Sequence, residues 1–231
     1  MKCRHCKTSL KHLFIDLGFS PPSNAYLYKK DLIRPEISYP LRIFVCDICW
    51  LVQTEDYAQA DVYFSADYAY FSSTSTSILD HAKNYVHMIK NKILLNKNSY
   101  VVEIASNDGY LLRNFIELGI PCLGIEPTDS TAEAAEKLSI PVIRKFFGNN
   151  LAKELVKNTK KADLIIGNNV YAHVPDINDF TKGLKTLLKP QGTISLEFAY
   201  LLCLIKYNQF DTIYHEHYSY LSLNSVKYIF E

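Results

Sequence analysis

The stretch SYVVEIASNDGYLLRNFIEL (Ser99–Leu118) decides the fold, because its pattern changes from strand to helix across one short turn. Apolar residues predict a strand over Ser99–Ala105, and SNDG (Ser106–Gly109) has the composition of a turn. A helix is predicted over Tyr110–Leu118. Units of this kind build α/β domains with parallel sheets.

The same alternation continues on both sides of this stretch. Apolar residues at helical spacing predict an amphipathic helix from Ser77 to Ile93. Further strands are predicted at Cys122–Glu126, Val142–Ile143, Asp163–Ile166 and Thr193–Glu197. Helices are predicted after caps at Ser130 or Thr131, after caps at Asn149 or Asn150, and over Ile177–Leu188, where KPQG ends the helix. The succession predicts a Rossmann-like parallel sheet that binds ligands at the carboxyl ends of its strands.

The turn after the first strand indicates the kind of ligand. EIASNDGYL has one glycine and lacks GxGxxG, so a diphosphate would not find the close backbone approach it needs. Glu126 ends the second strand, where it could accept hydrogen bonds from ribose hydroxyls. A nucleoside that carries an amino acid would suit Glu103, Asn107 and Asp108, and S-adenosylmethionine is such a molecule. The alternative is that Asp108 and Gly109 only form a turn and that Glu126 caps one.

Four of the six cysteines form two CxxC pairs, Cys3 with Cys6 and Cys46 with Cys49. Each spacing lets a tight turn direct both sulfurs at one tetrahedral ion, so we expect a closed, structural zinc site. Two chance pairs or a redox motif are the alternative, which the lack of a βαβ pattern around either pair disfavours.

The residues around these pairs carry three further expectations. His5 is expected to be a bystander, and Cys122 and Cys203 are expected to be buried small hydrophobes. The 39 residues between the pairs are predicted to form an irregular insertion, marked by Pro21, Pro22, Pro35 and Pro40.

A second concentration of chemistry is FDTIYHEHYSY (Phe210–Tyr220). Histidine titrates near neutral pH, and tyrosine and glutamate can hydrogen-bond to it or pass on protons, so the run suits acid–base chemistry. A tyrosine-rich strand with core or metal-bound histidines is the alternative. If the segment is extended, His215 and His217 share one face while Tyr214 and Glu216 share the other, so Tyr214 would serve the same proton transfer only through a twist or turn.

Composition excludes some classes of partner. The 231 residues are 48% hydrophobic and 13% aromatic, with a net charge of +1, which gives no electrostatic reason to expect a nucleic acid. The N-terminus lacks an apolar signal region, and no apolar run approaches the roughly 18 residues of a membrane span. We therefore expect a cytoplasmic protein without a membrane partner, in which cysteines serve as thiolates or metal ligands.

Several motifs together resemble one family. EIASNDGYLL, GIEPT, NNVYAHVPD, FDTIYHEHYSY and the CxxC pairs are similar to the S-adenosylmethionine-dependent sugar C-methyltransferases, which methylate nucleotide-linked deoxyketosugars. The resemblance implies a class I methyltransferase sheet, a small N-terminal zinc-binding domain, and a C-terminal domain that helps to form the sugar-nucleotide site. Because the chain stops at Glu231, we expect a truncated copy or fragment with an incomplete substrate site.

The expected organisation has four parts. Residues 1–62 form the zinc-binding domain, and residues 63–98 form a helical connector with a tyrosine-rich active-site segment. Residues 99–200 bind S-adenosylmethionine, and residues 201–231 hold the HEH segment and the start of the C-terminal region.

The resemblance also implies roles for individual residues. His217 would be the base that removes a proton next to a ketone, with Tyr214 and Glu216 beside it and with His173 and Tyr68 completing the pocket. The residue types agree, since an imidazole can take a proton and a phenol can donate to an enolate. The full cofactor set is Glu103, Ser106, Asn107, Asp108, Gly109, Glu126, Pro127, Asn168 and Asn169.

Simpler interpretations of two of these residues stay open. His173 could make only a turn hydrogen bond, and Tyr68 could be a core aromatic that shares a face with Tyr70. Two other functions are also possible. An O- or N-methyltransferase for a small metabolite would use the same cofactor, and a zinc-containing nucleic-acid-binding module would have no catalysis.

Overall fold

The computed structural model describes residues 1–23, 26–57 and 70–231, and it divides into two compact units. One unit combines Met1–Tyr63 with Asn169–Asn178 and Phe198–Glu231, and we call it the cysteine unit. The other combines Phe64–Asn168 with Asp179–Glu197, and we call it the sheet unit. Along the described residues, no helix combines the length and apolarity that crossing a membrane requires.

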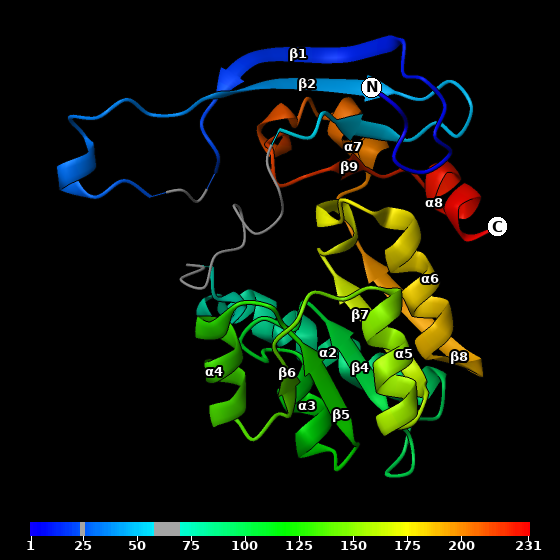
Figure 1. Ribbon diagram of the computed structural model, residues 1–231. Coiled ribbons are helices and arrows are strands. Elements are labelled where there is room, and N and C mark those ends of the chain that lie inside the picture. The colour runs from blue at the N-terminus through cyan, green and yellow to red at the C-terminus, as the bar shows by residue number, and fades with distance from the viewer. Residues whose placement is uncertain (24–25, 58–69) are drawn as a thin grey trace. The chain divides into compact units, whose positions relative to one another are not determined.

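The sheet unit is built on five parallel strands in the order β6-β5-β4-β7-β8 (Figure 1). Their bounds are β4 Val101–Ile104, β5 Cys122–Ile125, β6 Val142–Ile143, β7 Ala162–Asn168 and β8 Leu188–Glu197. This is the order 3-2-1-4-5 in sequence, as in doubly wound sheets, and it confirms the predicted Rossmann-like fold. The last strand is longer than predicted, because KPQG lies within β8.

Five helices belong wholly or mostly to the sheet unit: α2 Thr76–Lys92, α3 Leu112–Glu117, α4 Asp129–Lys137, α5 Asn149–Asn158 and α6 Ile177–Leu187. A short 3-10 helix, Ser72–Thr74, precedes α2. The chain moves in one direction along the sheet from β4 to β6 and in the other from β7 to β8. Right-handed crossovers therefore place α3 and α4 on one face and α5 and α6 on the other.

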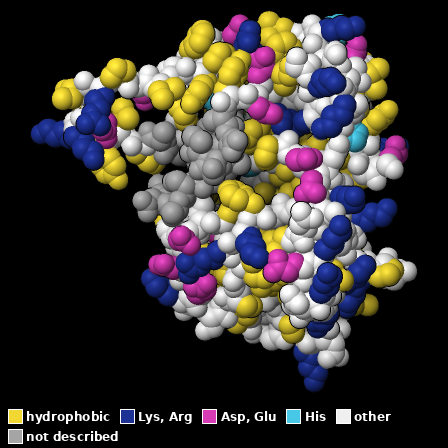
Figure 2. Space-filling model, viewed as in Figure 1, with side chains coloured by type: hydrophobic (Ala, Val, Ile, Leu, Met, Phe, Trp, Pro, Cys, Tyr) yellow, Lys and Arg dark blue, Asp and Glu magenta, His cyan; other side chains and the backbone are white. Residues whose placement is uncertain are grey.

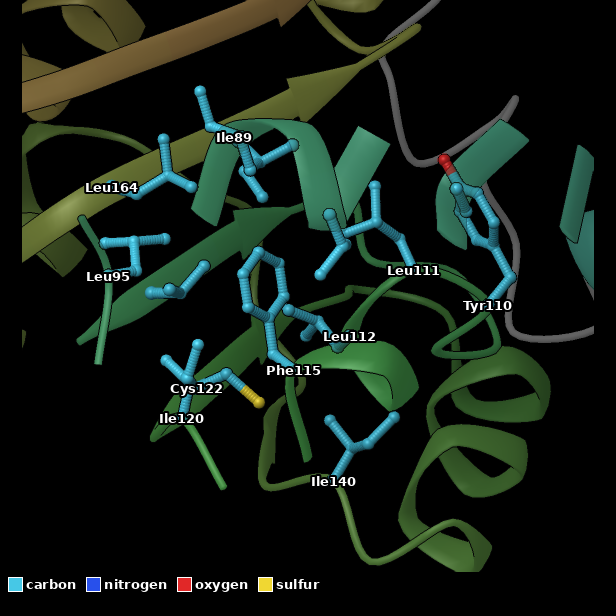
Figure 3. Close-up of a cluster of buried hydrophobic side chains, with 14 of the residues drawn as sticks. Ile89, Leu95, Tyr110, Leu111, Leu112, Phe115, Ile120, Cys122, Ile140 and Leu164 are labelled. Atoms are coloured by element: carbon cyan, nitrogen blue, oxygen red, sulfur yellow. The ribbon is translucent and has the colours of Figure 1, made fainter. Parts of the chain in front are cut away.

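The core under α2 and α3 is continuous and apolar. Phe115 of α3 is fully buried among Leu112, Ile120 and Cys122 (Figure 3). Val101 and Leu164 supply the sheet side of this cluster, and α2 contributes Ala82, Val86 and Ile89. The burial of Cys122 confirms its predicted place in the core.

Both predicted helix caps are wrong. The cap of α4 is Thr128, two or three residues before the predicted Ser130 or Thr131. Helix α5 starts after Gly148, and the carboxylate of Asp179 accepts a 3.0 Å hydrogen bond from the N–H of Asn149. A side chain from another helix thus replaces the local cap, which no local pattern in the sequence could indicate.

The cysteine unit contains a four-stranded sheet in the order β1-β2-β3-β9. The strands are β1 His12–Ser20, β2 Tyr39–Val45, β3 Val52–Thr54 and β9 Ser219–Tyr220, and all pairings are antiparallel. The insertion between the cysteine pairs is therefore not irregular as predicted. It contains the whole of β1 and β2, and Pro40 lies within β2, opposite Phe19 of β1.

Segments from the second half of the chain complete this unit. They include 3-10 helices at Tyr171–His173 and Phe210–Thr212, and helices α7 Leu201–Lys206 and α8 Leu223–Phe230; a further 3-10 turn, Lys29–Asp31, follows β1. Leu201 and Tyr220 join Leu41, Ile43 and Val52 in one buried cluster. Cys203 is exposed, against prediction, because α7 turns only one face to this cluster. Hydrophobic side chains are also exposed along β1 (Figure 2). Phe19 of this strand is 74% exposed.

Gly109 gives a test of the packing beneath the β4–α3 turn. Its φ is +78°, and an added Cβ would collide with Ile140 Cδ1 and approach Ala135. Gly119 also has positive φ, +65°, but open space around it. Gly119→Ala should cost about 1 kcal/mol of unfolding free energy from backbone strain alone.

Gly109→Ala should cost about 1–3 kcal/mol more than Gly119→Ala, since overpacking adds to the same strain. Urea denaturation of both variants measures the difference. Equal losses in the two variants would show that the core yields to the extra methyl group.

Candidate functional site

The four predicted metal ligands meet in one cluster. The sulfurs of Cys3, Cys6, Cys46 and Cys49 all lie within 4.8 Å of one another. Cys3 and Cys49 are 3.5 Å apart, as are Cys6 and Cys46. Tetrahedral zinc–sulfur bonds of about 2.3 Å place sulfurs roughly 3.8 Å apart, so this donor set fits zinc. All four positions are filled by protein thiols, which makes the site structural.

Gln53 supports the cluster, and sequence reasoning missed it. This fully buried amide donates a 3.3 Å hydrogen bond to Cys3 Sγ, while its oxygen accepts from the N–H of Arg4 at 2.8 Å. Hydrogen bonds from Cys49 and Gln53 lower the pKa of Cys3 to about 4. Gln53 follows Cys49 by four residues, but an ordinary strand glutamine carries no signal of this role. His5 is not among the clustered ligands.

The carboxyl end of β4 gathers buried acceptors that have no partner among the described residues. Glu103 Oε2, Ser106 Oγ and Asp108 Oδ1 make no hydrogen bond to any described residue. Burial, reinforced by nearby Glu126 and Asp108, raises the pKa of Glu103 well above its usual value. Buried acceptors without partners are costly unless a ligand satisfies them. The amino group and ribose hydroxyls of S-adenosylmethionine are donors of the kind these atoms need.

Glu126 already has protein partners. Its Oε2 accepts from the N–H of Asn107 at 2.8 Å, and its Oε1 accepts from the N–H and hydroxyl of Thr128 at 3.0 and 2.6 Å. The capping contact, left open as the alternative from sequence, is therefore present. A carboxylate offers about four lone-pair positions, so the three bonds leave capacity for one ribose hydroxyl.

Asn107 and Asp108 hold a segment that sequence reasoning did not connect with them. The amide of Asn107 accepts from the N–H of Ser72 at 2.9 Å and donates to the carbonyl of Tyr70 at 3.0 Å. Asp108 Oδ2 accepts from the N–H of Ser73 at 3.0 Å. The two side chains thus fix the approach to α2, and only one oxygen of Asp108 remains for a ligand.

The remaining predicted cofactor residues lie at strand ends. Pro127 follows β5 and Glu126. Asn168 ends β7, where its side chain hydrogen-bonds to buried Tyr110. Asn169 has φ +51° and belongs to the cysteine unit. Their roles in cofactor binding stay predictions.

The HEH segment forms a turn and is not extended. The N–H of His217 donates to the carbonyl of Tyr214 at 3.1 Å, which brings Tyr214 and His217 together despite their places on opposite faces of an ideal strand. Their rings lie 4.1 Å apart, and the Tyr214 hydroxyl is 2.9 Å from His217 Nε2. His217 Nδ1 lies 2.8 Å from the carbonyl of Thr212.

These contacts determine the tautomer of His217. A carbonyl only accepts, so Nδ1 carries the proton and Nε2 of the neutral ring presents its lone pair to the Tyr214 hydroxyl. Burial lowers the pKa of His217. The ring is therefore neutral at pH 7 and able to accept a proton at Nε2. Sequence patterns gave no sign of Thr212, which acts through its backbone.

His173 lies beside His217, with ring centroids 4.5 Å apart. Burial and the neighbouring His217 lower the pKa of His173 to about 3, although the ring hydrogen-bonds to the backbone of Glu216. His217 also borders a cavity of about 50 Å³, whose other lining residues are Asn169, Ala172, Phe198, Ala199, Ser219 and Tyr220. Ser219 was not predicted, and its buried hydroxyl makes no hydrogen bond to a described residue.

The other residues of the motif point elsewhere. Glu216 is buried and accepts a 2.7 Å hydrogen bond from the hydroxyl of Ser23. His215 Nε2 donates to the carbonyl of Pro40 at 3.1 Å, which ties the motif to β2. Tyr68 lies outside the described residues.

Comparison with known proteins defines the class. A family described as a zinc binding domain matches residues 3–64, and a family described as "Methyltransferase domain" matches residues 79–231. The chain therefore belongs to the methyltransferase family, with an N-terminal zinc-binding domain. This membership confirms the predicted cofactors, S-adenosylmethionine and zinc.

One curated relative is more specific. C-methyltransferase NovU of Streptomyces niveus is 34% identical over 230 residues, which cover 100% of this chain and 54% of NovU. The chain thus spans about half the length of that relative.

Solved structures agree on the fold. A methyltransferase from Anabaena variabilis has a TM-score of 0.50 at 17% identity, covering 63% of this chain and 68% of its own. YcgJ of Bacillus subtilis has a TM-score of 0.50 at 14% identity, covering 65% and 66%.

We expect one zinc ion per chain, because the four thiols complete a tetrahedral site. Cys46→Ser should abolish stoichiometric zinc and loosen the cysteine unit while the parallel sheet stays folded. Cys203→Ser, which removes an exposed thiol outside the cluster, should keep the zinc.

Elemental analysis and hydrogen exchange measure the two effects. Zinc-free wild-type protein purified without chelator would contradict the assignment. Equal loss of protection in both units of Cys46→Ser would show that they unfold as one.

Proposed function

We propose that the protein methylates a carbon next to the keto group of a nucleotide-linked deoxysugar, through an enolate formed by a base. The observation that carries the proposal is the neutral His217, whose Nε2 lone pair is directed at the Tyr214 hydroxyl. The whole-chain similarity to a C-methyltransferase supports transfer to carbon.

The chemistry requires removal of a proton from carbon before a methyl group can bond there. In the proposed reaction, substrate binding turns the Tyr214 hydroxyl from His217 Nε2 to the ketone oxygen. Nε2 then accepts the proton from the adjacent carbon, and Tyr214 donates a hydrogen bond to the enolate oxygen. S-adenosylmethionine, when bound, supplies the methyl group as an electrophile on a positively charged sulfur.

The surroundings of His217 favour this role. The Thr212 carbonyl stabilises the imidazolium that forms, because it accepts from Nδ1 in both protonation states. His173 stays neutral, so it adds no positive charge that would oppose protonation of His217. The chain also runs from the carboxyl ends of β7 and β8, at Asn168 and Glu197, straight into the segments that hold the two histidines.

An O- or N-methyltransferase would have less use for this arrangement. Hydroxyl and amine acceptors already carry lone pairs and need no enolate. They would leave the paired phenol and imidazole with only one proton to move.

Replacement of Glu126 tests the cofactor site. Glu126→Ala should weaken S-adenosylmethionine binding by about 1.5–3 kcal/mol, the usual range for a hydrogen bond to a charged group. The loss includes disorder of the turn that Glu126 holds through Asn107 and Thr128. Glu117→Ala, an exposed carboxylate on α3, is the control and should bind normally. Calorimetry decides, and wild-type protein that bound NAD and ignored S-adenosylmethionine would overturn the assignment.

Replacement of His217 separates proton removal from methyl transfer. In a form of the enzyme that methylates its substrate, His217→Asn should keep the cofactor affinity but lose both methylation and exchange of the substrate proton with heavy water. His215→Asn should keep both, because His215 faces the Pro40 carbonyl.

Proton exchange at the wild-type rate in His217→Asn would move the base to His173 or Tyr214.

The pH dependence of the methylation rate follows from the same residue. The neutral ring is the active form and its pKa is lowered, so the rate should increase as the pH is raised, level off before about pH 6.5 and stay constant through neutral pH.

A further inference from the structure

The turn between Cys3 and Cys6 carries two residues that are not ligands, Arg4 and His5. Together they reach from the metal-binding turn to the segments that hold His173 and His217. The role inferred for Arg4 and His5 rests on the proposed function, in which His173 and His217 are the catalytic candidates. All the contacts concerned lie within the cysteine unit.

Arg4 joins three segments. It is only 6% exposed. Its Nη1 donates to the carbonyl of Pro175 at 2.8 Å, and its Nη2 donates to the carbonyl of Thr54 at 3.1 Å and to Asp56 Oδ1 at 2.7 Å. The guanidinium also lies 5.2 Å from the centre of the Tyr218 ring, within cation–π range.

His5 makes a two-point contact with Asn178. The amide oxygen of Asn178 lies 2.7 Å from His5 Nδ1, and its Nδ2 donates to the carbonyl of His5 at 2.9 Å. The side chain of Asn178 therefore hydrogen-bonds both to the ring of His5 and to the backbone of the metal-binding turn. His5 is not a bystander, although it is not a metal ligand.

These contacts bracket both catalytic candidates. Pro175 lies two residues after His173, and Asn178 lies five residues after it. Arg4 and His5 therefore hold the loop that carries His173. Tyr218 follows His217 directly, and Thr54 Oγ1 donates to the carbonyl of His217 at 3.3 Å. One turn of four residues thus fixes the backbone on both sides of the 4.5 Å imidazole pair.

We propose that Arg4 and His5 are positioning residues, through which the metal-binding turn sets the geometry of His173 and His217. The cysteine cluster fixes the backbone of the turn. Three hydrogen bonds of Arg4 and His5 reach the loop of His173. Two more bind Arg4 to Thr54 and Asp56, and the loop of His217 is reached through Thr54 and through the ring of Tyr218. Metal binding and acid–base geometry are then coupled inside one unit.

Two variants break the contacts at opposite ends. Arg4→Met keeps the apolar stem and removes the donors, with Lys2→Met, an exposed cation of the same turn region, as control. Asn178→Ala removes the partner of His5 without touching the metal turn. Its control is Asn150→Ala, because Asn150 is exposed and holds the second position of α5 as Asn178 does of α6.

The readout is the titration of the imidazole rings of the 231-residue chain, followed by NMR. In Arg4→Met and in Asn178→Ala, loosened loops admit water, so the midpoint of His173 should rise toward about 6.5 by about one pH unit or more, and the midpoint of His217 should rise as well. Both controls should titrate as wild type. Zinc content should stay at one per chain in Asn178→Ala, and S-adenosylmethionine affinity should change by less than about two-fold in every variant.

Wild-type titrations of His173 and His217 in Asn178→Ala and in zinc-loaded Arg4→Met would overturn the proposal. If Arg4→Met fails to hold zinc, Asn178→Ala decides alone. The titrations need no substrate. A protein that shows the shifts but methylates no sugar would refute the proposed function and leave this inference standing. In a form of the enzyme that methylates its substrate, displacement of His173 and His217 should also lower kcat by up to about 100-fold while KM changes little.

Discussion

The convergence of four cysteine sulfurs is the constraint on which the cysteine unit depends. Residues 1–57 alone would have little core, since two of the five residues in the buried cluster of this unit, Leu201 and Tyr220, come from the second half of the chain. Segments this poor in apolar contacts usually need a metal or a covalent link to hold one structure. The metal-binding turns supply it, and β3 begins three residues after Cys49, already in position to pair with β9.

The sequence could predict the elements whose signals are local. Apolar strands followed by amphipathic helices gave the parallel sheet, and matched CxxC spacing gave the metal cluster. It failed where a distant residue provides the contact. Asp179 of α6, which accepts from the N–H of Asn149 at the start of α5, is such a residue. The conformation of the HEH segment stayed open for a related reason, because the 3.1 Å bond from His217 N–H to the Tyr214 carbonyl makes a turn from residues that also suit a strand.

The grouping of segments into units was harder still to predict. Only two residue pairs join β3 to β9, and Arg4 recognises two backbone carbonyls, which every residue type offers. No residue at position 54 or 175 had to be of a special kind for these bonds to form. The same holds for Thr212, whose carbonyl determines the tautomer of His217. Candidate residues could therefore be named from sequence, but the geometry that makes them useful could not.

Burial favours the uncharged form of the titratable groups at both candidate sites. At the end of β4, carboxylates Glu103, Asp108 and Glu126 lie close together, and their mutual repulsion adds to desolvation in raising the pKa of Glu103. Such a cluster is stabilised by a cation, and the proposed methyl donor is one. Around His217, burial likewise keeps two imidazoles uncharged. A charged pair there could not accept a proton. In the proposed reaction, the acidic cluster would bind the cationic cofactor, and an uncharged imidazole would accept the proton.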